Sequence, residues 1–250
     1  MATVVLTGAG GAIGSVTADL LQKRGARVIA LTRQSVDLSS LSSVRAIARE
    51  LNRNAGHIDA LLNLAAVFTT QYQRTADKFE LMLATNHLGP FLLTNLLRDR
   101  LINGGRVITV TAPSTTRVDV ERMLDRSRFS ATYSFGATKA ANLMFTFELA
   151  RRAHRWDVRA NAFHPGLVRS ELMREAPRPL LTLTRLVSSP AERAAQDLAD
   201  LALSPAHAGT TGWFFKGTRR IDPPRSVQDP TSQSNLWLRS AEMVGLEGGF

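Results

Sequence analysis

Cysteine is absent from the whole sequence of 250 residues. This absence excludes disulfide bonds, thiolate catalysis and metal sites with cysteine ligands, and it fits a cytoplasmic location. No run of about 18 apolar residues occurs, so the sequence predicts no membrane span. The first strand begins at residue 3 or 4, which leaves no room for a signal peptide. The 5 histidines lack the spacing of metal ligands, and we expect no metal site.

Acidic residues are the minority among the charged ones, with 21 Asp and Glu against 31 Lys and Arg and a net charge of +10. A basic balance can indicate nucleic-acid binding. The arginines are dispersed, however, and only short clusters occur at Arg151-Arg152 and Arg219-Arg220. This pattern favours a solvated basic surface over a nucleic-acid groove. With 44% hydrophobic residues, the chain suits one α/β domain over residues 1–250 that binds a small molecule.

The stretch from Val4 to Gly14 predicts a strand, a glycine-rich turn and the start of a helix. Gly8 permits the tight turn, Gly11 lets a pyrophosphate approach the backbone, and Gly14 lets the helix pack close to the strand. The N–H groups at the helix N-terminus then face the phosphates. Because the motif stands between a strand and a helix, it indicates dinucleotide binding rather than a plain turn.

The second strand is expected at Arg27–Leu31, and Arg33 follows its carboxyl end. An acidic residue there would favour NAD(H), whereas an arginine pairs with the 2′-phosphate of NADP(H). We therefore favour NADP(H) over NAD(H), with a solvent-facing arginine as the plain alternative. Only about four residues separate this strand from Val36-Asp37-Leu38, which is too few for a parallel crossover. The third strand is at best a stub, and the adenine side of the pocket should be open.

The rest of the chain predicts an α/β, Rossmann-like fold, a doubly wound parallel sheet with helices on both faces, shortened between strands 2 and 3. Pro90 predicts a kink near Asn86 within a long helix, and Ser43 is the expected N-cap of an earlier helix. Residues 167–188 are expected to form a substrate lid, and an Arg/Pro loop should follow residue 216. The expected strands are 58–63, 106–111, 158–163 and 212–215, and the expected helices are 39–54, 78–101, 135–152, 190–203 and 232–244.

Several longer motifs accompany the glycine turn. They are Thr7–Gly14 (TGAGGAIG), Asn63–Ala66 (NLAA), Thr85–Thr94 (TNHLGPFLLT), Thr138–Ala150 (TKAANLMFTFELA), His164–Ser170 (HPGLVRS), Ser189-Pro190 and Leu236–Leu246. Together they resemble the short-chain dehydrogenase/reductase superfamily over essentially the whole chain, and its retinol-dehydrogenase-like branch most. The resemblance implies an oxidoreductase in which Asn86 holds a water and Lys139 holds the nicotinamide ribose.

Two hydroxyl groups of that family's catalytic pattern are missing. The family motif YxxxK places a tyrosine four residues before the lysine, where this chain has Phe135, and the family's serine aligns with Ala112. Hydride transfer to a carbonyl creates an alkoxide that must be protonated or stabilised. Phe135 and Ala112 therefore leave the proton relay incomplete. Both are also the isosteric changes an experimenter makes to inactivate such an enzyme, and the sequence leaves that alternative open.

Other groups could replace the lost hydroxyls. Tyr133 and Ser114 each lie two residues from the usual positions and would serve only if the backbone register differs. Lys139 could act itself through water, with its pKa lowered by burial, or the substrate could supply the proton from a neighbouring hydroxyl. His87 and His164 neighbour the pocket motifs, although local structural roles are the simpler interpretation for both.

Three functional hypotheses follow. The first is an NADP(H)-binding oxidoreductase acting on the carbonyl or alcohol of a bulky apolar substrate, with an atypical or disabled proton relay. The second is a non-redox catalyst, such as a cyclase, lyase or isomerase, and the third is a catalytically silent dinucleotide sensor or partner-binding protein. The lid and the final helix could also form a homo-oligomer interface.

Under the resemblance, the cofactor contacts are Gly8, Gly11, Ile13 and Gly14 at the pyrophosphate, Arg33 at the 2′-phosphate, Asp37 and Leu38 at the adenine, Asn63 and Ala65 at the riboses, Lys139 at the nicotinamide ribose, and Pro165, Gly166 and Val168 along the nicotinamide.

Overall fold

The computed structural model contains a sheet of 7 strands in the order β2-β1-β3-β4-β5-β6-β7. Every neighbouring pair is parallel except β6 and β7. The structure describes residues 1–166, 168 and 190–250, so the expected lid at 167–188 lies outside them apart from Val168. The predicted doubly wound parallel fold is confirmed. The strands are β1 (Thr3–Thr7), β2 (Arg27–Leu31), β3 (Ala60–Asn63), β4 (Arg106–Val110), β5 (Arg159–His164), β6 (Phe214–Lys216) and β7 (Arg219–Ile221).

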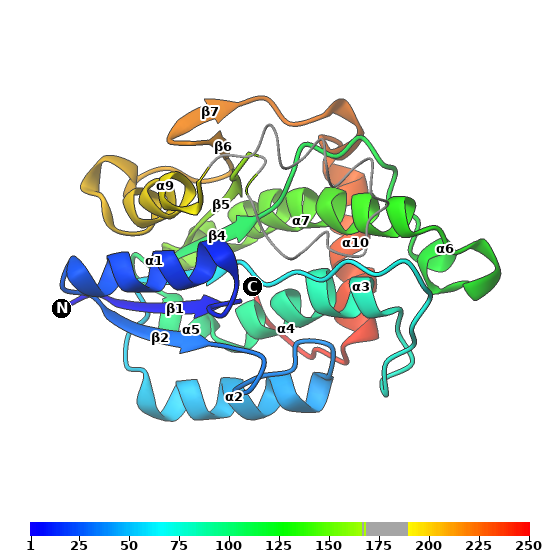
Figure 1. Cartoon of the computed structure of the whole chain (residues 1–250), viewed down its shortest axis with the longest axis horizontal. Helices are drawn as coiled ribbons and strands as arrows, with labels where there is room; N and C mark the ends of the chain where they lie inside the picture. Colours follow the sequence, from blue (N-terminus) through cyan, green and yellow to red (C-terminus); the bar gives the residue numbers. More distant parts are fainter. Residues whose placement is uncertain (167, 169–189) are drawn as a thin grey trace.

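Helices cover both faces of the sheet. The α-helices are α1 (Ala12–Lys23), α2 (Leu41–Asn54), α3 (Leu81–Leu83), α4 (Gly89–Leu96), α5 (Arg98–Leu101), α6 (Val120–Leu124), α7 (Ala131–Ala153), α9 (Ala191–Leu203) and α10 (Pro230–Met243). A π-helical turn, η1 (Ala84–Leu88), joins α3 to α4, and the 3₁₀ turns are η2 (Arg126–Arg128), η3 (His154–Trp156), η5 (Pro205–His207) and η6 (Arg225–Val227). Figure 1 shows α1 beside α9 on one side of the sheet and α2 beside α4 on the other.

The strand residues alternate between two apolar cores, because successive side chains of a strand point to opposite faces. Val5 and Leu61 face the core that is completed by α2, α4 and α7. Val4 and Leu62 face the core that is completed by α1 and α9. The central strands are therefore apolar on both faces, as expected for a sheet with a helical layer on each side.

The described residues contain no strand at Val36–Leu38, which confirms that the third strand is at best a stub. Val36 and Leu38 are nevertheless buried. The Leu38 backbone packs directly against α4, where a Cβ built on Gly89 would lie 2.3 Å from the Leu38 carbonyl oxygen. The segment thus packs on α4 through Leu38, which lies in a turn closed by the hydrogen bond from the Ser40 N–H to the Asp37 carbonyl, and Asp37 between the two buried residues stays exposed.

The long helix expected at 78–101 is broken into α3, η1, α4 and α5. Lys78 has a φ of 70°, in the left-handed region, so the helix cannot begin there. It begins after Glu80, whose buried carboxylate accepts hydrogen bonds from the N–H groups of Met82 and Leu83. The kink expected from Pro90 is realised as the π turn η1, which ends just before Gly89-Pro90.

Three further boundaries differ from the predictions. Ser40, not Ser43, caps α2, because the Ser40 hydroxyl accepts the hydrogen bond from the Ser43 N–H. Helix α7 begins at Ala131 rather than at 135. Strand β7 was missed, because the segment after residue 216 was interpreted as a loop. Gly217, with a φ of 64°, opens the tight turn between β6 and β7, and a glycine in first place is typical of such hairpins.

Two features are absent from residues 1–166, 168 and 190–250. In that part of the chain, no helix combines the length and hydropathy that crossing a membrane requires. The same residues bring together no group of three or more acidic, histidine or cysteine side chains suited to a metal ion.

Candidate functional site

At two positions between β1 and the first turn of α1, Gly8 and Gly14, backbone atoms approach too closely for a side chain. Gly8 has a φ of 71°, and a Cβ there would lie 2.8 Å from the backbone nitrogen of Ala65. A Cβ on Gly14 would lie 2.1 Å from the Gly8 carbonyl oxygen. Gly11 stands at the N-cap of α1 and places no side chain over the helix N-terminus. This leaves the N–H groups of α1 open to an anionic ligand.

The residues predicted to contact a cofactor follow the carboxyl ends of β1, β2, β3 and β5, which share one edge of the parallel sheet. Thr7 joins two of these ends, because its hydroxyl accepts hydrogen bonds from the N–H groups of Leu64 and Ala65. Gly166 has a φ of 78°, which bends the chain after β5. The residues on this edge are Gly8, Gly11, Ile13, Gly14, Arg33, Asp37, Leu38, Asn63, Ala65, Pro165, Gly166 and Val168.

Three of these residues differ in detail from their expected role. The buried Asn63 amide donates a hydrogen bond to Thr94 on α4, so its side chain points into the core rather than toward the edge. The Asp37 carboxylate accepts hydrogen bonds from the N–H and hydroxyl of Ser39. Leu38 is buried under α4. Their proposed contacts with adenine and ribose therefore need backbone atoms or the remaining lone pairs.

A dinucleotide fits the residues that the structure places at this edge. A Cβ on Gly8 or Gly14 would fill the cradle beside the N-terminus of α1, so the cradle exists only because these residues are glycines. Arg33 is exposed and forms no ion pair with a described carboxylate, which leaves its guanidinium available for a phosphate. Lys139 adds a second cation from α7. Cationic and N–H donors of this kind match the phosphates and hydroxyls of such a cofactor.

Asn86 lies in the π turn η1 and is fully engaged in hydrogen bonds. Its Oδ1 accepts from the Val67 N–H at 2.7 Å, and its Nδ2 donates to the Val67 carbonyl at 2.9 Å and to Thr138 Oγ1 at 3.3 Å. Pro90 has no N–H to serve as the α-helical donor to the Asn86 carbonyl, and Asn142 Nδ2 donates to that carbonyl at 3.0 Å instead. Little capacity remains for a water, so the water-holding role of Asn86 stays a prediction.

His87 links η1 to two other helices. Its ring nitrogens pair with Asn142 Oδ1 on α7 at 3.2 Å and with Ser240 Oγ on α10 at 2.9 Å. Burial lowers its pKa to about 4, against the opposing effect of the Asn142 hydrogen bond, so the ring is neutral at physiological pH. His164 ends β5, and burial together with the charge of Lys216 lowers its pKa as well. The neutral His87 ring is therefore not an acid in the physiological range.

Lys139 is the buried cation of the site. Burial alone lowers its pKa to about 8, and its Nζ forms no hydrogen bond or ion pair with a described residue. The nitrogen lies 5.2 Å from the centre of the Phe135 ring, one helical turn earlier on α7. Ala112 follows β4 and offers only a methyl group. The lysine therefore faces an aromatic ring where the motif YxxxK has a phenol.

The two substitute hydroxyls point elsewhere. The Tyr133 hydroxyl donates to the Arg117 carbonyl at 3.0 Å, and Arg122 lies over the Tyr133 ring at 3.8 Å. The Ser114 hydroxyl donates to the Gly136 carbonyl at 2.7 Å. Each hydroxyl is thus engaged with a backbone carbonyl. The structure thus gives no support to a rescue by either group.

The sequence reasoning missed an apolar cluster beside Lys139, which we call the aromatic wall. The T-shaped pair Phe68 and Phe135, at 5.5 Å between ring centres, forms its middle. Met82 and Phe129 pack against the same cluster. The apolar residues of 67–82 were the part of the sequence that could have indicated this cluster. They predict burial, but they do not show where the side chains pack.

Known proteins share these features. Residues 2–180 match the family model described as short chain dehydrogenase. The chain is 33% identical to retinol dehydrogenase 14 of Mus musculus, with 98% of this chain and 86% of that protein covered. It is also 33% identical to a Streptomyces sp. (strain C5) protein, DnrU, whose name describes a daunorubicin C-13 ketoreductase, with 97% of this chain and 92% of that protein covered.

Solved structures agree with these relatives. A Mycobacterium paratuberculosis protein of uncharacterised function superposes with a TM-score of 0.80 at 31% identity, covering 100% of this chain and 96% of the other. A 3-alpha-hydroxysteroid dehydrogenase of Pseudomonas sp. B-0831, complexed with NADH, has a TM-score of 0.72 over 86% of this chain and 96% of the other. At 21% identity the second likeness concerns the fold alone.

The fold and the glycine cradle define a dinucleotide-binding α/β protein. The matches place it further, because the chain belongs to the short-chain dehydrogenase/reductase family and is an oxidoreductase of that type. Within the family it groups with the retinol-dehydrogenase-like branch, as its motifs predicted.

Proposed function

We propose that the protein interconverts a ketone and an alcohol on a bulky apolar substrate, uses NADP(H), and moves the proton with Lys139. The observation that carries this proposal is the buried Lys139 amine beside Phe135 at the edge of the sheet that bears the glycine cradle. The cofactor, when bound, supplies or accepts the hydride. The remaining chemistry is proton transfer at the substrate oxygen, which falls to this chain's own residues.

Lys139 is suited to that step by its environment. In the reducing direction, the Lys139 ammonium gives its proton to the substrate oxygen as the hydride reaches the carbonyl carbon, and solvent then reprotonates the amine. A pKa of about 8 keeps most of the amine protonated at neutral pH, yet makes it a stronger acid than an ordinary lysine. General acids work best when their pKa is near the working pH.

The preference for NADP(H) rests on Arg33. Its guanidinium is exposed after β2, where the adenosine ribose of such a cofactor lies. A guanidinium can bind a 2′-phosphate through two parallel hydrogen bonds, whereas a 2′-hydroxyl gives it no charge to neutralise. The glycines of the cradle would hold the pyrophosphate, and Lys139 the nicotinamide ribose.

The substrate class rests on the aromatic wall. The Phe135 ring lies next to Lys139, and Phe68 and Phe129 continue the apolar surface from it, with no hydrogen-bonding group among the three rings. Such a surface favours a large apolar body beside the reacting carbonyl. The names of the relatives agree, since retinol and daunorubicin are both bulky molecules.

The test is turnover of the aldehyde retinal, of daunorubicin and of other bulky ketones with NADPH and with NADH, by the wild-type protein and Lys139→Met. We expect turnover that prefers NADPH and is lost in the variant. Substrate conversion without oxidation of NADPH would instead favour a cyclase, lyase or isomerase. Tight NADPH binding with no conversion of any substrate, and a specific macromolecular partner, would favour a silent sensor.

We further propose that residues 1–250 form a single domain, that the protein is cytoplasmic and that it is a homo-oligomer. The lack of cysteine supports the location. Proteolysis, cell fractionation and analytical ultracentrifugation test them.

A further inference from the structure

A row of aromatic side chains leads from Lys139 toward the surface. The Lys139 amine lies 5.2 Å from the Phe135 ring, and Phe135 meets Phe68 edge to face at 5.5 Å. Phe129 packs on the same cluster and meets the ring of Tyr72 edge to face at 5.6 Å. The aromatic wall is therefore continuous with Tyr72 at its outer end.

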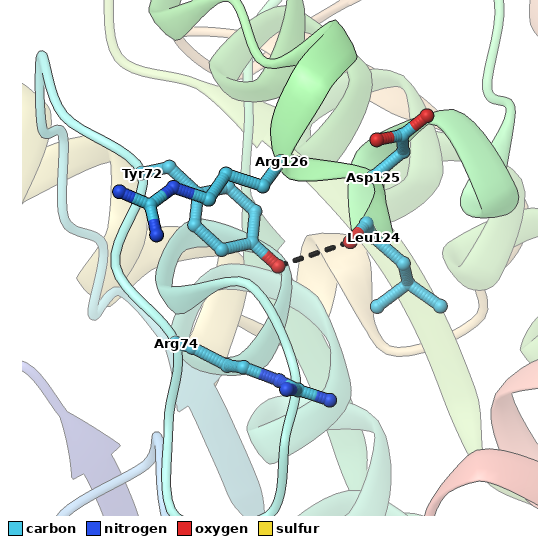
Figure 2. A pocket seen from close by; sticks show the side chains of 5 residues that line it. All are labelled: Tyr72, Arg74, Leu124, Asp125 and Arg126. Atoms are coloured by element: carbon cyan, nitrogen blue, oxygen red, sulfur yellow. Dashed lines mark hydrogen bonds between the residues drawn. The ribbon is translucent and has the colours of Figure 1, made fainter.

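Tyr72 borders a surface cavity of about 430 Å³, which is drawn in Figure 2. The Tyr72 hydroxyl donates to the Leu124 carbonyl at 3.0 Å, which fixes the ring as one side of the cavity. Two arginines complete the lining, Arg74 from the loop before α3 and Arg126 from η2. The cavity thus joins an aromatic surface to two guanidinium groups.

The two arginines keep most of their hydrogen-bonding capacity. Arg74 uses its Nε to donate to the Lys78 carbonyl, and neither Arg74 nor Arg126 forms an ion pair with a described carboxylate. Asp125 also lines the cavity, but its carboxylate accepts hydrogen bonds from the N–H and hydroxyl of Ser127. Figure 2 shows that carboxylate turned away from both guanidinium groups. The cavity therefore presents a net positive charge.

We infer that this cavity is an anion subsite, which holds a carboxylate or phosphate group at the far end of the substrate. The inference rests on the proposed function, because the aromatic wall would carry the apolar body between that anion and the carbonyl at Lys139. Paired guanidinium groups recognise both anions through charge-assisted hydrogen bonds. The substrate class becomes an amphipathic ketone, with a large apolar body and one anionic end.

A second cavity nearby supplies a matched control. It is lined by Arg117, Val118, Asp119, Arg122 and Tyr133. There Arg122 is stacked on the Tyr133 ring, and Asp119 lies 3.8 Å from the Arg128 guanidinium. Arg117 is exposed and has no part in the proposed subsite. Removing the charge of Arg117 therefore measures how much the overall positive charge of the protein contributes to anion binding.

The experiment uses acetylbiphenyls whose far end carries a carboxylate, its methyl ester or a phosphate, on spacers of different length. Their affinity is measured by calorimetry on the protein saturated with NADP⁺, which has no hydride to give, so binding is measured without turnover. We expect one spacer length at which the acid binds about five to ten times more tightly than the ester. Arg74→Gln and Arg126→Gln should each remove most of that ratio, whereas Arg117→Gln should preserve it.

Equal affinity of acid and ester at every length, or no binding of either, would overturn the subsite. An equal loss in Arg117→Gln would also overturn it, because the attraction would then belong to the overall charge. A preserved ratio without ketone turnover would support the subsite and refute the proposed function. Comparison of carboxylate with phosphate shows which of the two anions the arginines prefer.

Discussion

Replacing Phe135 with tyrosine should turn this site into an efficient ketone reductase. The Phe135 ring centre lies 5.2 Å from the Lys139 amine. At about that separation, two unit charges interact by roughly 3 kcal/mol at an effective dielectric constant of about 20. Protonated Lys139 would therefore lower the pKa of the new phenol from about 10 by about two units. A phenol with a pKa near 8 is a suitable general acid at neutral pH.

Such an acid contributes about 100-fold to 10,000-fold to a rate, and we expect Phe135→Tyr to raise kcat by a factor in that range. The assay is NADPH oxidation in the presence of a bulky ketone, with NADPH affinity measured separately by fluorescence. Phe147→Tyr is the matched control, because it adds the same hydroxyl to a half-buried ring farther along α7. Ala112→Ser, alone and combined with Phe135→Tyr, tests the second missing hydroxyl.

Two results would contradict this prediction. If Phe135→Tyr binds NADPH as tightly as the wild type but reduces no ketone faster, the reacting carbonyl does not lie beside residue 135. The site would then have been rebuilt for other chemistry. A gain in Phe147→Tyr equal to that in Phe135→Tyr would show that the effect is not local to Lys139.

Further predictions concern the cradle, the cofactor preference, the buried network and the lysine. Gly14→Ala should abolish NADPH binding, because its Cβ would lie 2.1 Å from a carbonyl oxygen, whereas Gly10→Ala, with no atom within 4 Å of its Cβ, should bind normally in the same fluorescence titration. Arg33→Glu should weaken NADPH binding at least about tenfold and favour NADH, because it repels the 2′-phosphate. Asn142→Leu should lower the free energy of unfolding in urea by about 2 kcal/mol or more, because it strands buried groups on Asn86 and His87, and an unchanged urea midpoint would contradict this. Lys139→Met should be more stable than the wild type by roughly 3 kcal/mol at neutral pH, because burial lowers the lysine pKa from 10.5 to about 8. At pH values between these two pKa values, the unfolded chain binds more protons than the native one, so the free energy of unfolding of the wild type increases with pH. The difference in stability between Lys139→Met and the wild type should therefore decrease as pH rises.

The parts of the molecule that the sequence predicted are those fixed by local geometry. The glycine turn was predictable because the steric limits that require Gly8 and Gly14 arise within one strand–turn–helix unit. The missing third strand was predictable because too few residues separate it from β2. Strand β7 was not predictable from the sequence, because its three residues, two of them arginine, have little intrinsic preference for a strand. It forms because β6 pairs with it.

The hydrogen bonds of the site depended on contacts between distant segments. Pro90 showed that the Asn86 carbonyl would lose its helical donor, but nothing near it in the sequence indicated Asn142 as the new one. Glu80 likewise gave no sign that it would begin the helix, because its capping role needs a buried carboxylate beside two N–H groups. Propensity and periodicity describe one segment at a time, whereas a hydrogen-bond partner such as Asn142 lies in a different segment from Asn86.

The start of α7 decides which proton donors remain. Because the helix already includes Tyr133, that ring points about 200° around the axis from Phe135, and the Arg117 carbonyl and the Arg122 guanidinium hold it there. No tyrosine hydroxyl can then reach Lys139 unless one is introduced at residue 135. Under the proposed function, the proton then comes from Lys139 or from the substrate itself. The lysine acts only while protonated, so the rate of reduction by the wild type should fall as pH rises through about 8. If the substrate supplies the proton instead, the rate should not change over that pH range.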